Sequence, residues 1–123
     1  MKLNIITDNT TCKTYYNFKS CHNVILYNII HDNNSIGIIG TINENNLLFD
    51  LEEKYHSYKN INKIFDKFIK ILKIDILFVN LKIPNPIFTQ LGFIHHKQNV
   101  YKYFIKYHQI FHYKYPSVKY FTT

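Results

Sequence analysis

The spacing of apolar residues changes twice along this chain, and this change limits the folds open to it. From residue 24 to residue 55 the apolar residues form short runs, such as VILYNIIH at 24–31, separated by asparagine-rich clusters. At 61–74 they recur at helical spacing, and at 75–81 (DILFVNL) a continuous apolar run returns. Short apolar runs are typical of buried strands, whereas i, i+3, i+4 spacing is typical of an amphipathic helix. The pattern predicts an α+β domain.

The strands before the helix are expected to form an antiparallel meander. A short β-prone segment occupies 2–7, and further strands are predicted at 24–31 and 36–42. One more strand is predicted in 47–55, beginning at residue 47. Turn clusters rich in Asn, Asp and Ser separate the last three. Gly37 and Gly40 lie inside the second of these, which predicts that another group approaches the backbone closely there.

The helix at 61–74 is the clearest element in the sequence. Asn60 is the expected N-cap, and lysines on the polar face are expected to be solvated. Because the strand at 75–81 follows the helix directly, we expect it to pair in parallel with the strand before the helix. The prediction is a single mixed, mostly antiparallel sheet with a central amphipathic helix.

A second, short helix is predicted at 86–91 (PIFTQL). Pro86 suits its first position, and Gly92 is expected to end it in the left-handed conformation. A hairpin over 93–97 and 100–107 follows, turning at Gln98 and Asn99. We therefore predict one domain over 1–107 and a tyrosine-rich tail over 108–123.

The chain is basic, with 15 lysines, 8 acidic residues and a formal net charge of +7. Arginine and alanine are absent, and isoleucine, asparagine, lysine, tyrosine and phenylalanine dominate. These abundant residues have A+T-rich codons, so an A+T-rich genome explains most of the charge. The lysines form no block, and arginine is the residue best suited to phosphate and guanine. A nucleic-acid partner is therefore not favoured.

Several other classes are not expected. No apolar run reaches the ~18 residues of a membrane span, and 1–9 has no secretory signal. Cys12 and Cys21, with His95, His96, His108 and His112, match no zinc spacing. We expect no metal, and a reducing, cytoplasmic compartment for the two cysteines.

One late segment resembles a known family. Residues 85–93 (NPIFTQLGF), followed by the strand VYKYFIK, resemble the late motif of the GCN5-related N-acetyltransferase (GNAT) superfamily, in which an Asn and a short helix lead to Leu-Gly-Phe before the last two strands. The preceding meander and amphipathic helix also fit. The resemblance covers about residues 24–106, and it implies the acyl-CoA N-acyltransferase fold, shortened at the N-terminus.

The resemblance also implies an activity and a cofactor. Members bind acetyl-CoA and transfer its acetyl group to a primary amine by direct attack. They hold the pyrophosphate on backbone N–H groups of a Gly-x-Gly loop that opens the central helix. The residues matching that loop are Lys59, Asn60, Ile61, Asn62 and Lys63, with asparagines in place of both glycines. Asn85 matches the motif asparagine, and Phe88 stands where many members have a tyrosine that protonates the departing thiolate.

The family often takes its base from the strand before the central helix. Asp50, Glu52 and Glu53 lie there and are the candidate catalytic acids. Only residues 8–23 separate the first two strands, where members usually have one or two helices. This predicts an open acceptor side that suits a protein or peptide amine.

Two alternatives remain open. The altered loop and Phe88 also fit a catalytically inactive GNAT-like domain kept for binding or structure. A basic nucleic-acid-binding domain is the third interpretation, with Lys102 and Lys106 interleaved among Tyr101, Tyr103 and Tyr107. If the aromatic-rich C-terminal end is exposed, a homodimer is a further expectation.

Overall fold

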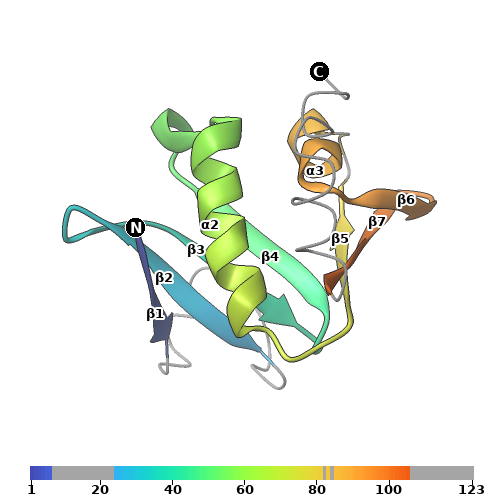
Figure 1. The fold of residues 1–123 in the computed structure, drawn as a ribbon, viewed down its shortest axis with the longest axis horizontal. Helices are drawn as coiled ribbons and strands as arrows, with labels where there is room; N and C mark the ends of the chain where they lie inside the picture. Colours follow the sequence, from blue (N-terminus) through green and yellow to red (C-terminus); the bar gives the residue numbers. More distant parts are fainter. Residues whose placement is uncertain (7–23, 82, 84, 106–123) are drawn as a thin grey trace. The chain divides into compact units, whose positions relative to one another are not determined.

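The computed structural model describes residues 1–6, 24–81, 83 and 85–105. The chain divides into two compact units, and the boundary lies between His56 and Ser57. The first contains strands β1 (Lys2–Ile6), β2 (Ile25–His31), β3 (Asn34–Ile42) and β4 (Asn46–Leu51), then the 3-10 turn η1 (Glu53–Tyr55). The second contains helix α2 (Tyr58–Ile71), strand β5 (Ile76–Asn80), helix α3 (Pro86–Leu91) and strands β6 (Ile94–Lys97) and β7 (Val100–Phe104), all labelled in Figure 1.

The first unit is the predicted antiparallel meander. Strand β2 lies between β1 and β3, and β4 follows β3. Asp32 and Asn33 turn the chain from β2 to β3 with φ values of 50° and 65°. Two successive positive φ values are those of a type I′ hairpin turn, and Asn and Asp tolerate them better than most residues do. Local turn chemistry therefore sets the register next to the turn, where His31 pairs with Asn34 and Ile30 with Ser35.

Gly37 and Gly40 allow neighbouring strands to lie unusually close to β3. A Cβ atom built on Gly37 would overlap the carbonyl oxygen of Asp50 and lie 2.9 Å from the Cα atom of Leu51. One built on Gly40 would overlap the carbonyl oxygen of Ile25. The predicted close approach is confirmed, and the approaching groups are the backbones of β4 and β2.

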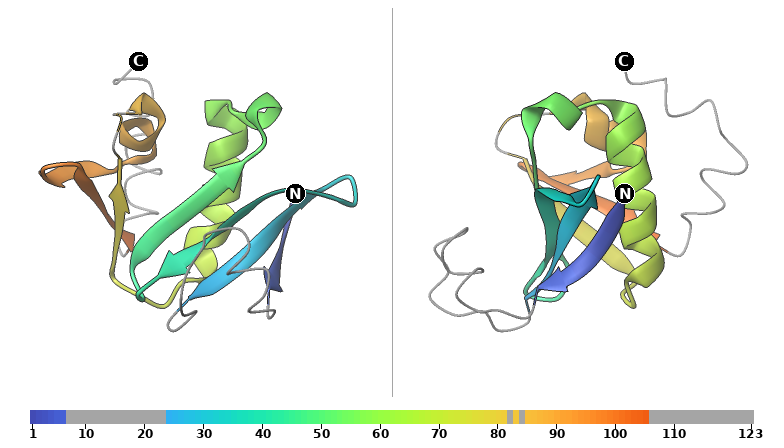
Figure 2. Two further views of the ribbon diagram at one scale, coloured as in Figure 1. Left: turned by 180° about the vertical axis from the view of Figure 1, so that it is seen from behind. Right: turned by 90° about the vertical axis from the view of Figure 1, so that its left-hand side faces the viewer.

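In the second unit, three antiparallel strands combine with two helices. Strand β7 pairs with β5 on one side and with β6 on the other, so the hairpin lies beside β5 (Figure 2). Helix α3 and its ends agree with prediction. The Asn85 side chain caps it by accepting the N–H of Ile87 at 3.0 Å, and Gly92 ends it with φ 113°. Only glycine adopts that conformation without strain.

The predicted start of the long helix is wrong. Helix α2 begins at Tyr58, not Ile61, and ends at Ile71, not Ile74. Its N-cap is Ser57, whose side chain accepts the N–H of Asn60, so Asn60 lies inside the first turn. The strand predicted over 47–55 is also shorter, because β4 ends at Leu51 and residues 53–55 form η1. Helical periodicity did not predict the first turn, because the apolar stripe begins only at Ile61 and residues 58–60 lie before it.

Three aromatic rings form the centre of the second unit. Phe65 of α2 contacts Phe93 and Tyr103, with centroid distances of 5.5 and 5.1 Å. Phe93 and Tyr103 also contact each other at 5.2 Å. Leu91 and Phe93, the apolar residues of the Leu-Gly-Phe motif, are almost fully buried. Burying a side chain of this size contributes roughly 1.5–3 kcal/mol, so this motif is part of the core.

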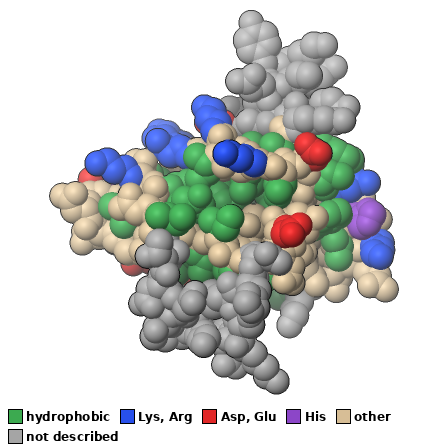
Figure 3. Space-filling model, turned by 90° about the horizontal axis from the view of Figure 1, so that it is seen from below, with side chains coloured by type: hydrophobic (Ala, Val, Ile, Leu, Met, Phe, Trp, Pro, Cys, Tyr) green, Lys and Arg blue, Asp and Glu red, His purple; other side chains and the backbone are tan. Residues whose placement is uncertain are grey.

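The predicted α+β class is confirmed, and each strand pair described within the two units is antiparallel. Among the described residues, no helix is long and apolar enough to cross a membrane. Figure 3 shows one face of the molecule, with hydrophobic side chains in green, lysines in blue and acidic side chains in red. The tail predicted at 108–123 lies outside the described residues.

Candidate functional site

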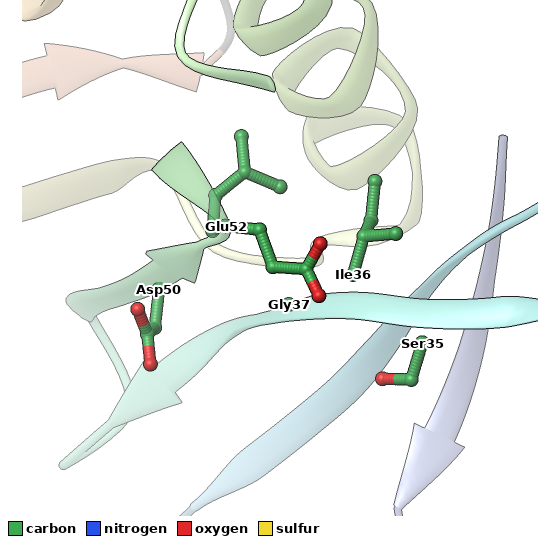
Figure 4. A pocket seen from close by; sticks show the side chains of 6 residues that line it. Ser35, Ile36, Gly37, Asp50 and Glu52 are labelled. Atoms are coloured by element: carbon green, nitrogen blue, oxygen red, sulfur yellow. The ribbon is translucent and has the colours of Figure 1, made fainter. Parts of the chain in front are cut away.

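A small hollow in the first unit contains two of the three predicted catalytic acids. It has a volume of about 230 Å³ and lies between the start of β3 and the end of β4. Its lining residues are Ser35, Ile36, Gly37, Asp50, Leu51 and Glu52. Gly37 contributes only backbone atoms to this lining, and Figure 4 shows the side chains of its neighbours.

The three acids differ in where their side chains lie. Glu52 extends across Gly37 toward Ile36, whereas the Asp50 carboxylate points away from Glu52 (Figure 4). Glu53 begins η1, is exposed, and does not line the hollow. The structure therefore brings Asp50 and Glu52 to one site and leaves Glu53 outside it. Glu52 also lies 4.0 Å from the Lys54 ammonium group, a surface ion pair that contributes little to stability.

The residues predicted to hold a pyrophosphate form the first turns of helix α2 and not a loop. The Ser57 side chain accepts a hydrogen bond from the N–H of Asn60 at 3.2 Å, and the Ser57 carbonyl accepts one from the N–H of Ile61 at 3.0 Å. Ile61 is buried, and the Asn62 side chain accepts the Tyr58 hydroxyl at 3.3 Å. Asn60-Ile61-Asn62 therefore does not have the open backbone of a Gly-x-Gly loop.

Two lysines of this group remain in a position to meet an anion. Lys59 and Lys63 are exposed on consecutive turns of α2, four residues apart on the same side of the helix. The first turn of α2 contains no acidic residue. Positive charge there adds to the positive end of the helix dipole, which disfavours the isolated helix and favours an anionic ligand.

Asn85 and Phe88 have structural contacts of their own. The Asn85 side chain caps α3, as described above. Phe88 is half-buried, and its ring meets that of Phe93 edge-on at 5.5 Å. The backbone of Phe88 also contributes, because its carbonyl accepts the N–H of Phe93 at 3.0 Å. Both residues therefore help to shape the Leu-Gly-Phe end of α3.

Tyr103 belongs to the core of the second unit. It is 3% exposed, and burial raises the pKa of its hydroxyl above the usual value of about 10, with the charge of Asp66 adding to the rise. A buried ring cannot stack on a nucleic-acid base. Tyr103 therefore cannot be one of the base-stacking tyrosines of the nucleic-acid-binding interpretation. Lys106 and Tyr107 lie outside the described residues.

Within 1–6, 24–81, 83 and 85–105, no group of three or more His, Cys, Asp or Glu residues could hold a metal ion. His95 instead bonds to the carbonyl of Gln98 at 2.8 Å, and His96 contacts the ring of Phe78. Cys12, Cys21, His108 and His112 lie outside the described part of the chain.

Sequence reasoning missed two residues that follow the acids in the chain, His56 and Ser57. Ser57 caps α2, and the ring of His56 bonds to the carbonyl oxygen of Leu51 at 2.6 Å. The signal for Ser57 was its position three residues before Asn60, because an N-cap side chain bonds to the N–H two or three residues later. For His56 the only signal was its position in the sequence, three residues after Glu53.

The chain was also compared with known proteins. It matches no protein-family model and no curated protein.

Proposed function

We propose that this chain is an acetyl-CoA-dependent N-acetyltransferase of the GNAT type. The proposal rests on the order of elements, in which a strand, a three-strand meander, a helix, a strand, a short helix and a hairpin follow one another as the resemblance implies. The observation that carries it is local. Two acids line a hollow at the end of β4, and in the sequence only η1 and His56 lie between Glu52 and Ser57, the N-cap of α2.

In the proposed reaction the amine nitrogen attacks the carbonyl carbon of the thioester. A carbon–nitrogen bond forms, the carbon–sulfur bond breaks, and coenzyme A leaves as a thiolate. The attacking amine loses a proton to Glu52 or Asp50, either directly or through a water molecule, and the thiolate takes up a proton from solvent. Lys59 and Lys63, with the positive end of α2, are the residues that would attract the phosphates of the cofactor.

The acceptor is proposed to be a primary amine on a protein or peptide. A carboxylate beside an open hollow attracts an ammonium group and can take up its proton. The hollow is small and bounded by only two strands, so a side-chain amine such as that of lysine would fit more readily than a large rigid molecule.

The first test is binding. A ligand that binds only the folded chain must raise its melting temperature, so acetyl-CoA should do so in thermal unfolding. A Lys59→Gln, Lys63→Gln double variant should need a higher acetyl-CoA concentration for the same shift. A Lys97→Gln, Lys102→Gln variant on the β6–β7 hairpin, with the same change in charge, should behave as wild type. No shift for the wild-type chain at millimolar acetyl-CoA would overturn the proposal.

The second test is turnover. Acetylation of a lysine-containing peptide should be detected by mass spectrometry and should fall by roughly 10²-fold or more in Glu52→Gln if Glu52 is the base. Glu53→Gln is the matched control and should retain activity, because Glu53 does not line the hollow.

A second candidate function is a catalytically inactive acyl-CoA-binding domain. The packing of Phe88 on Phe93 favours it, because no hydroxyl is present at that position to protonate the thiolate. Stabilisation by acetyl-CoA without any acetyl transfer would select this function over the first.

A further inference from the structure

The backbone of Glu52 is held at both of its polar groups. Its N–H donates to the carbonyl oxygen of Ile36 on β3 at 2.9 Å, one residue beyond the last residue of β4. Its carbonyl oxygen accepts the N–H of Tyr55 at 3.0 Å, which closes the turn η1. The Cα position of Glu52 is therefore tied to β3 on one side and to η1 on the other.

His56 adds a side-chain bond to the same turn. Its Nε2 atom lies 2.6 Å from the carbonyl oxygen of Leu51, and its backbone N–H donates to the Glu53 carbonyl at 3.0 Å. A carbonyl oxygen can only accept, so Nε2 carries the hydrogen and donates. The ring thus joins the end of the turn to the residue that immediately precedes Glu52.

We infer that His56 is a positioning residue, which holds the turn after β4 so that the Glu52 side chain extends over Gly37 into the hollow. This inference rests on the proposed acetyltransferase function. Glu52 is the acid that the bond serves, because it directly follows Leu51 and lines the hollow, whereas the Asp50 carboxylate points away from Glu52 and Glu53 lies outside the hollow (Figure 4).

The physical reason is pre-organisation. A base that is already placed for proton transfer avoids the loss of rate that a misplaced group brings, and a misplacement of about 1 Å can cost on the order of 10²-fold. Leu51 and Glu52 are adjacent, so a bond to the Leu51 carbonyl restrains the peptide plane from which Glu52 starts. Loss of the bond should lower kcat and should leave KM for acetyl-CoA near its wild-type value.

Two variants separate the donor from the ring. His56→Gln keeps an N–H donor at a similar reach, whereas His56→Phe keeps an aromatic ring and has no donor. We expect kcat for a lysine peptide to fall about tenfold or more in His56→Phe and to stay within about threefold of wild type in His56→Gln. His95→Phe is the matched control, because His95 makes the same kind of bond to the carbonyl of Gln98. It should leave kcat unchanged.

Amide hydrogen exchange provides a readout that needs no turnover. The N–H groups of Tyr55 and His56, which close η1, should exchange faster in His56→Phe than in wild type and His56→Gln. Wild-type turnover with an equal kcat in His56→Phe would overturn the positioning role. A wild-type chain without turnover would overturn the proposed function and with it the positioning role. In that case the exchange rates test only whether the hydrogen bond from His56 to the Leu51 carbonyl stabilises the turn. Equal rates in all three proteins would show that it does not.

Discussion

The Ser57 hydroxyl oxygen accepts the backbone N–H of Asn60 at 3.2 Å, and this bond marks where helix α2 begins. Replacing Ser57 with Ala removes the cap and leaves an N–H of the first turn without its partner. We expect the free energy of unfolding to fall by about 1 kcal/mol, as for other N-caps. Ser57→Asp, which keeps an acceptor and adds a charge that suits the helix dipole, should retain wild-type stability. Denaturant unfolding of the three proteins tests this, and equal stability of Ser57→Ala and wild type would contradict it.

The two helices show why one helix start could be predicted from the sequence and the other could not. For α3, Asn85, Pro86 and Gly92 are all local signals that agree with one another. For α2, Ser57 and Asn60 are both good capping residues, and the apolar stripe begins only at Ile61. Periodicity favoured Asn60, but the hydrogen bond is made by Ser57. The residues predicted to form a pyrophosphate loop lie, for the same reason, in the first turns of α2.

The candidate acids show a second limit of sequence reasoning. The sequence places Asp50, Glu52 and Glu53 near the end of one strand, but it cannot rank them. Which acids line the hollow depends on the hydrogen bond from the N–H of Glu52, just beyond β4, to the carbonyl of Ile36 on β3. It also depends on the turn that ends β4 at Leu51. Neither has a local signature, whereas the glycines of β3 did predict a close approach correctly.

Gly37 provides a test of that close approach. In Gly37→Ala the new methyl group would overlap the Asp50 carbonyl oxygen, and backbone atoms cannot move aside as a flexible side chain would. Overpacking of this kind typically costs about 1–3 kcal/mol, so we expect a loss of stability in that range. Ser35→Ala, an exposed neighbour on β3, should change stability by less than about 0.5 kcal/mol. Similar unfolding midpoints for both variants would contradict this close packing of β4 against Gly37.

Tyr103 should make stability depend on alkaline pH. Below about pH 10 the phenol is protonated in both the folded and the unfolded chain, so it adds no pH dependence. Above that pH the unfolded chain loses this proton first, because burial raises the pKa of the folded phenol. The unfolded state then binds fewer protons, and stability falls as pH rises, by up to about 1.4 kcal/mol for each pH unit.

The variant Tyr103→Phe isolates this contribution from the other titrating groups. Between pH 9 and pH 11 the wild-type chain should lose more unfolding free energy than Tyr103→Phe does, by about 1 kcal/mol. Denaturant unfolding at both pH values measures the difference. Equal losses in the two proteins would show that the Tyr103 phenol ionises as readily in the folded chain as in the unfolded chain.

Phe88→Tyr tests what the missing hydroxyl costs the proposed reaction. The ring of Phe88 is half-buried and packs edge-on against Phe93, so a tyrosine can keep this contact. A general acid at this position would protonate the departing thiolate. We therefore expect kcat for acetyl transfer to rise on the order of tenfold, with little change in stability.

Phe88→Leu is the control for this change, because it removes the ring without supplying a proton. It should lower the free energy of unfolding by about 1 kcal/mol through loss of the aromatic contact, and it should not raise kcat. Steady-state kinetics with acetyl-CoA and a lysine peptide, together with thermal unfolding, measure both effects. An unchanged kcat in a stably folded Phe88→Tyr would mean that thiolate protonation does not limit turnover, and that Phe88 acts through packing alone.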